Sequence, residues 1–138
     1  MMYSKSMKKA LLLLFIINLS IIQCYSKHLY KEEVYQEYWC KQHNGIMEFQ
    51  LDDKTRIDCL TQQYAVEVDF ANKWAECIGQ SLYYGLKTKK CPACLLIMEK
   101  GVKDEKYLKR LRYVANKKGI DIFTITPDKI DEACFYNK

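Results

Sequence analysis

The sequence is poor in several features that define common classes of protein. It has five glycines and two prolines in 138 residues, and it contains no internal repeat and no low-complexity segment. A chain of this length without repeats has room for one ordinary hydrophobic core, and an apolar content of 49% is enough to fill it. These absences argue against a repeat array and favour one small domain.

Patterns of cysteine and histidine that bind zinc are also missing. The chain has two histidines, His28 and His43, and its single Cys-x-x-Cys spacing runs from Cys91 to Cys94. A structural zinc site needs four such ligands, and neither a second Cys-x-x-Cys nor a His-x-x-x-His accompanies the first. Zinc is therefore not expected, and His43 is interpreted as a residue near the end of the first helix.

Long apolar runs are absent except for one near the N-terminus, and that run is short for a membrane span. Residues 10–17 are apolar and follow three lysines, which is typical of a secretory signal peptide. We expect cleavage after Ser26, so that residues 1–26 are the signal peptide and residues 27–138 the mature domain. The protein would then be exported, periplasmic or secreted, without stable insertion in a membrane; an uncleaved anchor is the alternative.

A large excess of one charge is absent once this leader is removed. The full chain has a net charge of +5, and the leader holds three lysines and no acidic residue, which leaves +2. Two local basic clusters lie at residues 87–90 and 103–118, and such clusters can follow the phosphates of a nucleic acid. The second cluster also carries apolar residues at helical spacing, and the exposed face of an amphipathic helix is charged in any case.

Cysteine, in contrast, is abundant for so small a domain. Seven are present, and six of them follow the signal peptide, which suits disulfides formed in an oxidising compartment. Six cysteines allow many pairings, so the sequence does not choose among them. Cys91 and Cys94 form a pair of the kind used by dithiol oxidoreductases. That chemistry needs a strand before the pair and a helix after it, whereas residues 87–90 indicate a loop and residues 95–98 a buried strand. A local disulfide between the two is therefore favoured.

The most distinctive pattern is the alternation of apolar and acidic residues at positions 65–69. Because successive side chains of a strand point to opposite faces, Glu67 and Asp69 share one face of the predicted strand. Two carboxylates side by side repel each other unless a cation neutralises them, and hard oxygen ligands suit Mg²⁺ or Mn²⁺. The pattern therefore predicts a divalent metal site.

A third carboxylate, Asp58, lies on the preceding strand, which is expected at residues 56–60. Opposing side chains of adjacent antiparallel strands are about 5 Å apart, so Asp58 and Glu67 are predicted to bind the same cation. Glu48, on a strand expected at residues 46–51, is a further candidate ligand, although a solvated strand face explains it equally well.

A helix is expected directly after the acidic strand. Lys73 and Gln80 recur at helical spacing and therefore share one of its faces. We predict that Lys73 partners the carboxylates and that Gln80 positions Lys73 or a phosphate. An apolar stripe on another face of this helix is interpreted as core.

The remaining segments complete an α/β pattern. In order, the expected elements are a helix, a three-strand meander, a helix, a strand, a helix, a strand and a short final helix, at residues 31–42, 46–51, 56–60, 65–69, 70–80, 95–98, 103–117, 120–126 and after Pro127. This order implies a mixed sheet flanked by helices.

In their order and spacing the acidic and helical residues resemble the motifs of the PD-(D/E)XK nuclease superfamily, which includes restriction endonucleases, Holliday-junction resolvases and RecB-type nuclease domains. The likeness covers about residues 30–126. The family's early Glu, strand-end Asp, Glu-x-Lys strand and Gln-x-x-x-Tyr helix are matched by Glu48, Asp58, Glu67 to Asp69, and Gln80 to Tyr84. Asp69 stands where the family has its lysine, and Lys73, one turn into the following helix, resembles a migrated substitute.

The resemblance implies a restriction endonuclease-like fold and a nuclease that hydrolyses phosphodiester bonds of nucleic acid, with DNA expected rather than RNA. It also implies Mg²⁺ or Mn²⁺ held by carboxylates. The residues to which these roles fall are Glu48, Asp58, Glu67 and Asp69 as metal ligands, and Asp58, Glu67, Lys73 and Gln80 as catalytic residues. Because the Glu-x-Lys lysine is lost, a secreted binding or effector module on the same scaffold is the alternative. The sequence leaves strand and sequence specificity and the oligomeric state open.

Overall fold

A computed structural model describes residues 28–136 of the chain. The predicted signal peptide at residues 1–26 lies outside the described residues. Among the described residues, no helix combines the length and the apolar composition needed to span a membrane.

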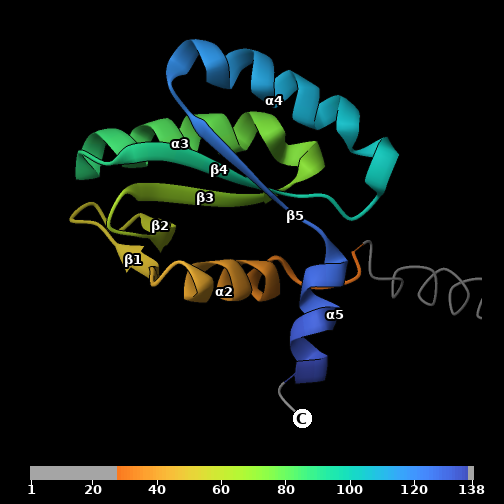
Figure 1. Cartoon of the computed structure of the whole chain (residues 1–138). Coiled ribbons are helices and arrows are strands. Elements are labelled where there is room, and N and C mark those ends of the chain that lie inside the picture. Colours follow the sequence, from red (N-terminus) through yellow and green to blue (C-terminus); the bar gives the residue numbers. More distant parts are fainter. Residues whose placement is uncertain (1–27, 137–138) are drawn as a thin grey trace, which may run out of the picture.

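The described residues form one five-stranded mixed sheet with helices on both faces (Figure 1). The elements are α2 (Glu32–Gln42), β1 (Ile46–Gln50), β2 (Arg56–Leu60), β3 (Tyr64–Phe70), the short 3₁₀ turn η1 (Ala71–Lys73), α3 (Trp74–Thr88), β4 (Cys91–Ile97), a second 3₁₀ turn η2 (Gly101–Lys103), α4 (Glu105–Lys118), β5 (Asp121–Ile125) and α5 (Pro127–Tyr136). The α/β class, the mixed sheet and the flanking helices predicted from the sequence are confirmed.

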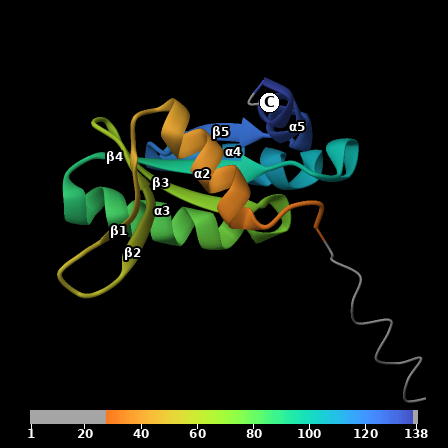
Figure 2. The same ribbon diagram turned by 90° about the horizontal axis from the view of Figure 1, so that it is seen from below.

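The strands lie in the sheet in the same order as in the chain. β1, β2 and β3 form an antiparallel meander, and β4 and β5 then continue parallel to β3. A parallel neighbour needs a crossover connection, and α3 and α4 supply the two crossovers. Both crossover helices, α3 and α4, lie on one face of the sheet, and α2 and α5 cover the other face (Figures 1 and 2).

Two boundaries differ from those expected. α3 extends to Thr88, and β4 begins at Cys91 rather than at residue 95. β4 pairs with β3 along its whole length, from Tyr64 opposite Cys91 onward, so the neighbouring strand draws the Cys-x-x-Cys segment into the sheet. Pro92 is tolerated there because the ladder to β5 starts only at Ala93.

A core of apolar side chains lies on each face of the sheet. On the α2 side it contains Tyr35, Trp39, Val66, Val68, Leu95, Ile97, Ile125 and Ile130; on the α3 side it contains Cys77, Cys94, Leu96, Leu108, Leu111 and Ala115. Strand β4 contributes to both, and its residues 93–97 are all buried. A strand covered on both faces is expected to be apolar throughout, and this explains the uninterrupted apolar run in β4.

The hairpin of β1 and β2 changes face at its middle. Met47 and Cys59 are paired and pack on the α2 side, whereas Phe49 and Ile57, two positions further along each strand, join a small cluster against Tyr84 of α3. The intervening Glu48 has a φ of 52°. A non-glycine residue rarely adopts this left-handed conformation, and its presence within a strand rotates both strands of the hairpin.

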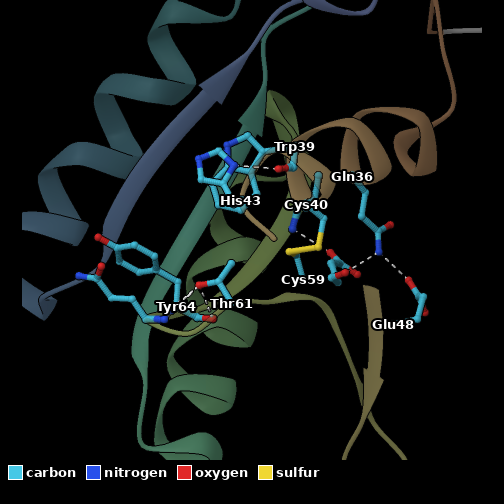
Figure 3. Close-up of a disulfide and its surroundings, with 11 residues drawn as sticks. Gln36, Trp39, Cys40, His43, Glu48, Cys59, Thr61 and Tyr64 are labelled. Atoms are coloured by element: carbon cyan, nitrogen blue, oxygen red, sulfur yellow. Dashed lines mark hydrogen bonds between the residues drawn. A yellow bond between two sulfur atoms is a disulfide. The ribbon is translucent and has the colours of Figure 1, made fainter. Parts of the chain in front are cut away.

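A disulfide joins Cys40 of α2 to Cys59 of β2 (Figure 3). Gly45 lies against both sulfur atoms, and a Cβ atom there would overlap them, so only glycine leaves room for the bridge. Closing a loop of this length stabilises a fold by about 3 kcal/mol. The bond fixes α2 on the face of the sheet that it covers.

The segment before α2 is held by one carboxylate at the end of β4. Glu99 Oε1 accepts the backbone N–H groups of Leu29 (2.9 Å) and Tyr30 (3.2 Å) and the hydroxyl of Tyr35 (2.8 Å). Its other oxygen, Oε2, lies 2.9 Å from Nδ1 of His28. Four donors thus converge on Glu99 and fix the entry into α2.

Candidate functional site

Glu67 and Asp69 lie on the α3 side of β3. Only 5% and 4% of their surfaces are exposed. Glu67 is opposite Cys94 and Asp69 opposite Leu96 in the parallel ladder, and both of these β4 residues belong to the core beneath α3 and α4. The side-by-side carboxylates predicted from the alternation are therefore present, and they are buried in an apolar layer.

Few donors reach these two carboxylates. Gln80 of α3 donates its amide N–H to Glu67 Oε1 at 2.5 Å, and Lys73 Nζ lies 3.5 Å from Asp69 Oδ1. The other two oxygens, Glu67 Oε2 and Asp69 Oδ2, are buried and have no hydrogen-bond partner among the described residues. A buried acceptor without a donor costs about 1 to 3 kcal/mol, and more when it is charged. The sheet therefore holds two oxygens suited to a cation that the protein itself does not provide.

Asp58 approaches the same place from β2. The β2–β3 ladder pairs Leu60 with Ala65 and Cys59 with Val66 and then stops. The next pair would place Asp58 opposite Glu67, as predicted, but instead Asp58 Oδ2 accepts the backbone N–H of Val68 at 2.7 Å. The Asp58 carboxylate thus takes the position of a strand carbonyl at the centre of β3.

A fourth carboxylate, that of Glu32, comes from the first turn of α2. Its Oε2 lies 3.8 Å from Lys73 Nζ, so the lysine stands between Glu32 and Asp69. The sequence did not reveal Glu32, because acidic residues are ordinary in the first turn of a helix, where they complement the helix dipole. Only the packing of α2 against the end of β3 makes it part of the site.

Burial and mutual repulsion raise the pKa values of the grouped acids. Burial raises the pKa of Glu67 to about 9, with Asp58 and Asp69 adding repulsion. Burial, followed by Glu32, raises the pKa of Asp69 to about 7, and Lys73 opposes this rise. Burial also raises the pKa of Asp58 to about 7 in spite of its hydrogen bond from a backbone N–H. Without an added cation, Glu67 therefore holds its proton at neutral pH, whereas Asp58 and Asp69 are only partly ionised there.

Glu48 lies beside Asp58 but has its own partners. Gln36 of α2 donates both to Glu48 Oε1 and to the backbone carbonyl of Asp58, at 2.8 Å each (Figure 3). Arg56 is 3.8 Å from the other Glu48 oxygen, and 48% of the Glu48 side chain is exposed. Gln36, which sequence reasoning also missed, therefore ties together the two strand residues at the point where the hairpin changes face.

Carboxylate oxygens are the ligands that Mg²⁺ and Mn²⁺ prefer, but the carboxylates of this site are not arranged as a complete metal-binding shell. Within residues 28–136, no three His, Cys, Asp or Glu side chains are close enough together to hold a metal ion as they stand. Mg²⁺ commonly binds through one or two carboxylates and keeps several waters. Two buried carboxylates with one partnerless oxygen each satisfy that requirement, and Asp58 lies on the adjoining strand.

The cysteines expected to pair locally do not do so. Cys91 is an exposed free thiol and Cys94 a buried one, both within β4. Residues three apart on a strand point to opposite faces, which prevents the Cys91–Cys94 disulfide considered from the sequence. A dithiol oxidoreductase would place Cys91 at a helix N-terminus, whereas here it begins a strand. The disulfide found among the described residues is Cys40–Cys59 instead.

No protein-family model, no curated protein sequence and no solved structure matches this chain.

Proposed function

We propose that this protein is a metal-dependent, nuclease-like hydrolase that cleaves phosphodiester bonds of nucleic acid, DNA rather than RNA, at the acidic site on β3. The observation that carries this proposal is the pair of buried oxygens, Glu67 Oε2 and Asp69 Oδ2, that no donor of residues 28–136 reaches. Natural proteins satisfy nearly all buried polar atoms, and exceptions concentrate at functional sites. The motif order of the PD-(D/E)XK nucleases supports the same chemistry.

Asp58, Glu67 and Asp69 would hold Mg²⁺ or Mn²⁺. When bound, such an ion lowers the pKa of a coordinated water and offsets negative charge on the phosphate. Gln80 fixes the orientation of Glu67 through its hydrogen bond. Lys73, held between Asp69 and Glu32, presents a positive charge at the edge of the site, where it can stabilise charge that develops on the phosphate.

The left-handed backbone of Glu48 supports a functional role for the same region. Residues held in sparsely populated backbone conformations cluster at active sites, because the strain is retained only where the arrangement is needed. Here the unusual residue adjoins Asp58, and Gln36 bridges the two. The disulfide agrees with an oxidising compartment and hence with export.

A second candidate function is a secreted binding or effector module that does not cut. Two observations favour it: Lys73 is occupied by two carboxylates, and the described residues offer no ready set of three ligands. In that case the acidic site would bind a cation or a basic partner without catalysis.

The deciding experiment is an assay of the mature, oxidised protein on a mixed panel of DNA and RNA, with Mg²⁺, with Mn²⁺ and with chelator. We expect metal-dependent cutting that Glu67→Gln and Lys73→Gln abolish. Glu37→Gln, an exposed glutamate on α2, is the matched control and should cut normally. Absence of cutting by folded protein with either metal would overturn the nuclease proposal and favour the binding module.

A further inference from the structure

A cavity lies next to the acidic site on the same side of the sheet. Its volume is about 340 Å³, and it is lined by Asn72, Lys100, Lys103, Asp104, Lys106 and Tyr107. Asn72 belongs to η1, which follows β3, and the other residues follow β4. The cavity therefore lies beyond the carboxyl ends of two parallel strands, which is where open α/β sheets bind their ligands.

The cavity adjoins the acidic site through η1. Asn72 directly precedes Lys73, and Lys73 forms the ion pair with Asp69 at the end of β3. Helix α4, which carries two of the lining residues, contacts this same turn. The cavity therefore lies beside the Lys73 end of the acidic site, in the direction in which a bound strand of nucleic acid could continue.

The charge of the lining is positive and uncompensated. The ammonium groups of Lys100, Lys103 and Lys106 form no salt bridge with any carboxylate of the described residues. The one lining carboxylate, Asp104, is 6% exposed and accepts the backbone N–H of Lys100 at 2.9 Å, so it shapes the turn rather than pairing with a lysine. In contrast, Lys87 in the other basic cluster is already paired with Asp52 at 2.8 Å.

An aromatic ring completes the cavity. Tyr107 is partly buried, and the charged groups of Lys106 and Arg110 lie 4.8 Å and 5.7 Å from its ring centre. An aromatic ring among cations is the combination with which proteins bind single-stranded nucleic acid, because the ring stacks on a base while the cations contact the phosphates.

We propose that this cavity binds a phosphate of the nucleic acid strand whose scissile bond lies at the acidic site, with Tyr107 against the adjoining base. The inference rests on the proposed function. It extends that function by naming the residues that contact the substrate backbone and by predicting that the substrate is at least partly single-stranded.

The test compares two double variants that each remove two lysines from the same part of the chain. Lys103→Gln/Lys106→Gln alters the cavity, whereas Lys109→Gln/Lys118→Gln removes two exposed lysines of α4 that do not line it. Binding of a short, labelled single-stranded DNA by the mature chain is measured by fluorescence anisotropy in chelator, at several salt concentrations.

We expect the cavity variant to bind the DNA roughly tenfold more weakly. The slope of the log of its association constant against log salt should become less negative by about 2. The control pair should change both quantities much less. Equal losses in the two double variants would show a diffuse basic helix face and overturn the inference. Inorganic phosphate that displaces the DNA fully at low concentration would overturn it too, because the cavity would then be a site for free phosphate.

The same variants separate this inference from the proposed function. Metal-dependent cutting with wild-type affinity in the cavity variant would refute the cavity and leave the nuclease intact. Cavity-dependent binding without cutting would refute the nuclease and support the cavity as the contact of a non-cutting nucleic acid binder.

Discussion

Two glutamates on opposite sides of the sheet, Glu67 beneath α3 and Glu99 beside α2, differ in the hydrogen-bond donors that surround them. Glu99, whose side chain is 5% exposed, receives four donors from the segment around α2. Burial raises its pKa, but the hydrogen bonds from Tyr35, Tyr30 and His28 outweigh burial, and the pKa lies below its ordinary value. As a whole residue Glu67 is more deeply buried, with 5% of its surface exposed; among the described residues it receives one donor, from Gln80, and its pKa rises to about 9.

The difference shows that the unsatisfied carboxylates are not a general weakness of this fold. Donors surround Glu99, whereas each of two neighbouring acids on β3 has one oxygen without a partner in the described part of the chain. Stability alone would favour apolar side chains at Glu67 and Asp69, because the surrounding layer is apolar. Their presence in this layer agrees with binding of a cation.

The largest effect on the free energy of unfolding should come from replacing each of the two glutamates by glutamine in turn. Glu99→Gln removes the charge and replaces one of the two acceptor oxygens by an NH₂ group that faces a donor, and we expect it to lower the free energy of unfolding by about 3 kcal/mol. Glu67→Gln in chelator should be neutral or stabilising, because it removes the cost of protonating the Glu67 carboxyl on folding at pH 7, where the pKa rises from 4.5 to about 9. Urea unfolding at pH 7 measures both, and similar destabilisation by the two variants would contradict the comparison.

The pH dependence of stability should also separate the two glutamates. The folded pKa of Glu67 is raised from 4.5 to about 9, so the folded state binds its proton more tightly and stability falls as pH rises from about 4.5 toward 9. We expect Glu67→Gln to remove part of that fall, on the order of 2 kcal/mol.

Glu99 should behave in the opposite sense. Its folded pKa is lowered, so its contribution is present above pH 4.5 and is lost as pH falls below that value. Urea unfolding of wild type and of both glutamine variants from about pH 2.5 to about pH 9, in chelator, checks both signs. A pH profile of Glu67→Gln that overlays the wild type would show that Glu67 does not titrate in this range.

The smallest expected effect is the stabilisation of the folded protein by Mg²⁺, which should depend on Glu67 and Asp69 and not on Glu99. At ten times its dissociation constant, Mg²⁺ should stabilise the wild type by about 1.4 kcal/mol. It should stabilise Glu99→Gln equally and Glu67→Gln/Asp69→Asn scarcely at all. Thermal unfolding with and without Mg²⁺ provides the measurement, and Ca²⁺ is a useful second cation because it tolerates a wider range of coordination geometries. Equal stabilisation of all three proteins would place the ion elsewhere.

Much of the architecture was accessible from local sequence patterns. The alternation at residues 65–69 and the short connections predicted the meander, and they placed Glu67 and Asp69 on one face of β3. The same spacing placed Asp58 near Glu67. These features depend on side-chain periodicity and short-range register, which a sequence displays directly.

Features that depend on tertiary packing were not accessible. Glu32 and Gln36 reach the site only because of where α2 packs on the sheet. The Cys40–Cys59 disulfide depends on the same position of the helix. The strand that contains Cys91 was missed at its start because pairing with β3 overrides the weak strand propensity of a segment with proline. Spacing along the chain carries little information about such contacts.

The change of face at Glu48 divides the hairpin between two halves of the molecule. Its inner part is joined covalently to α2 through Cys59, while its outer part, with Phe49 and Ile57, packs against α3. Proteins open locally in contiguous cooperative units, and the two parts of this hairpin belong to different packing clusters. We therefore expect amide hydrogens on the two sides of Glu48 to exchange as separate groups. The acidic site would then lie on the seam between two foldons, where a cation that bridges Asp58 and Glu67 would couple their opening.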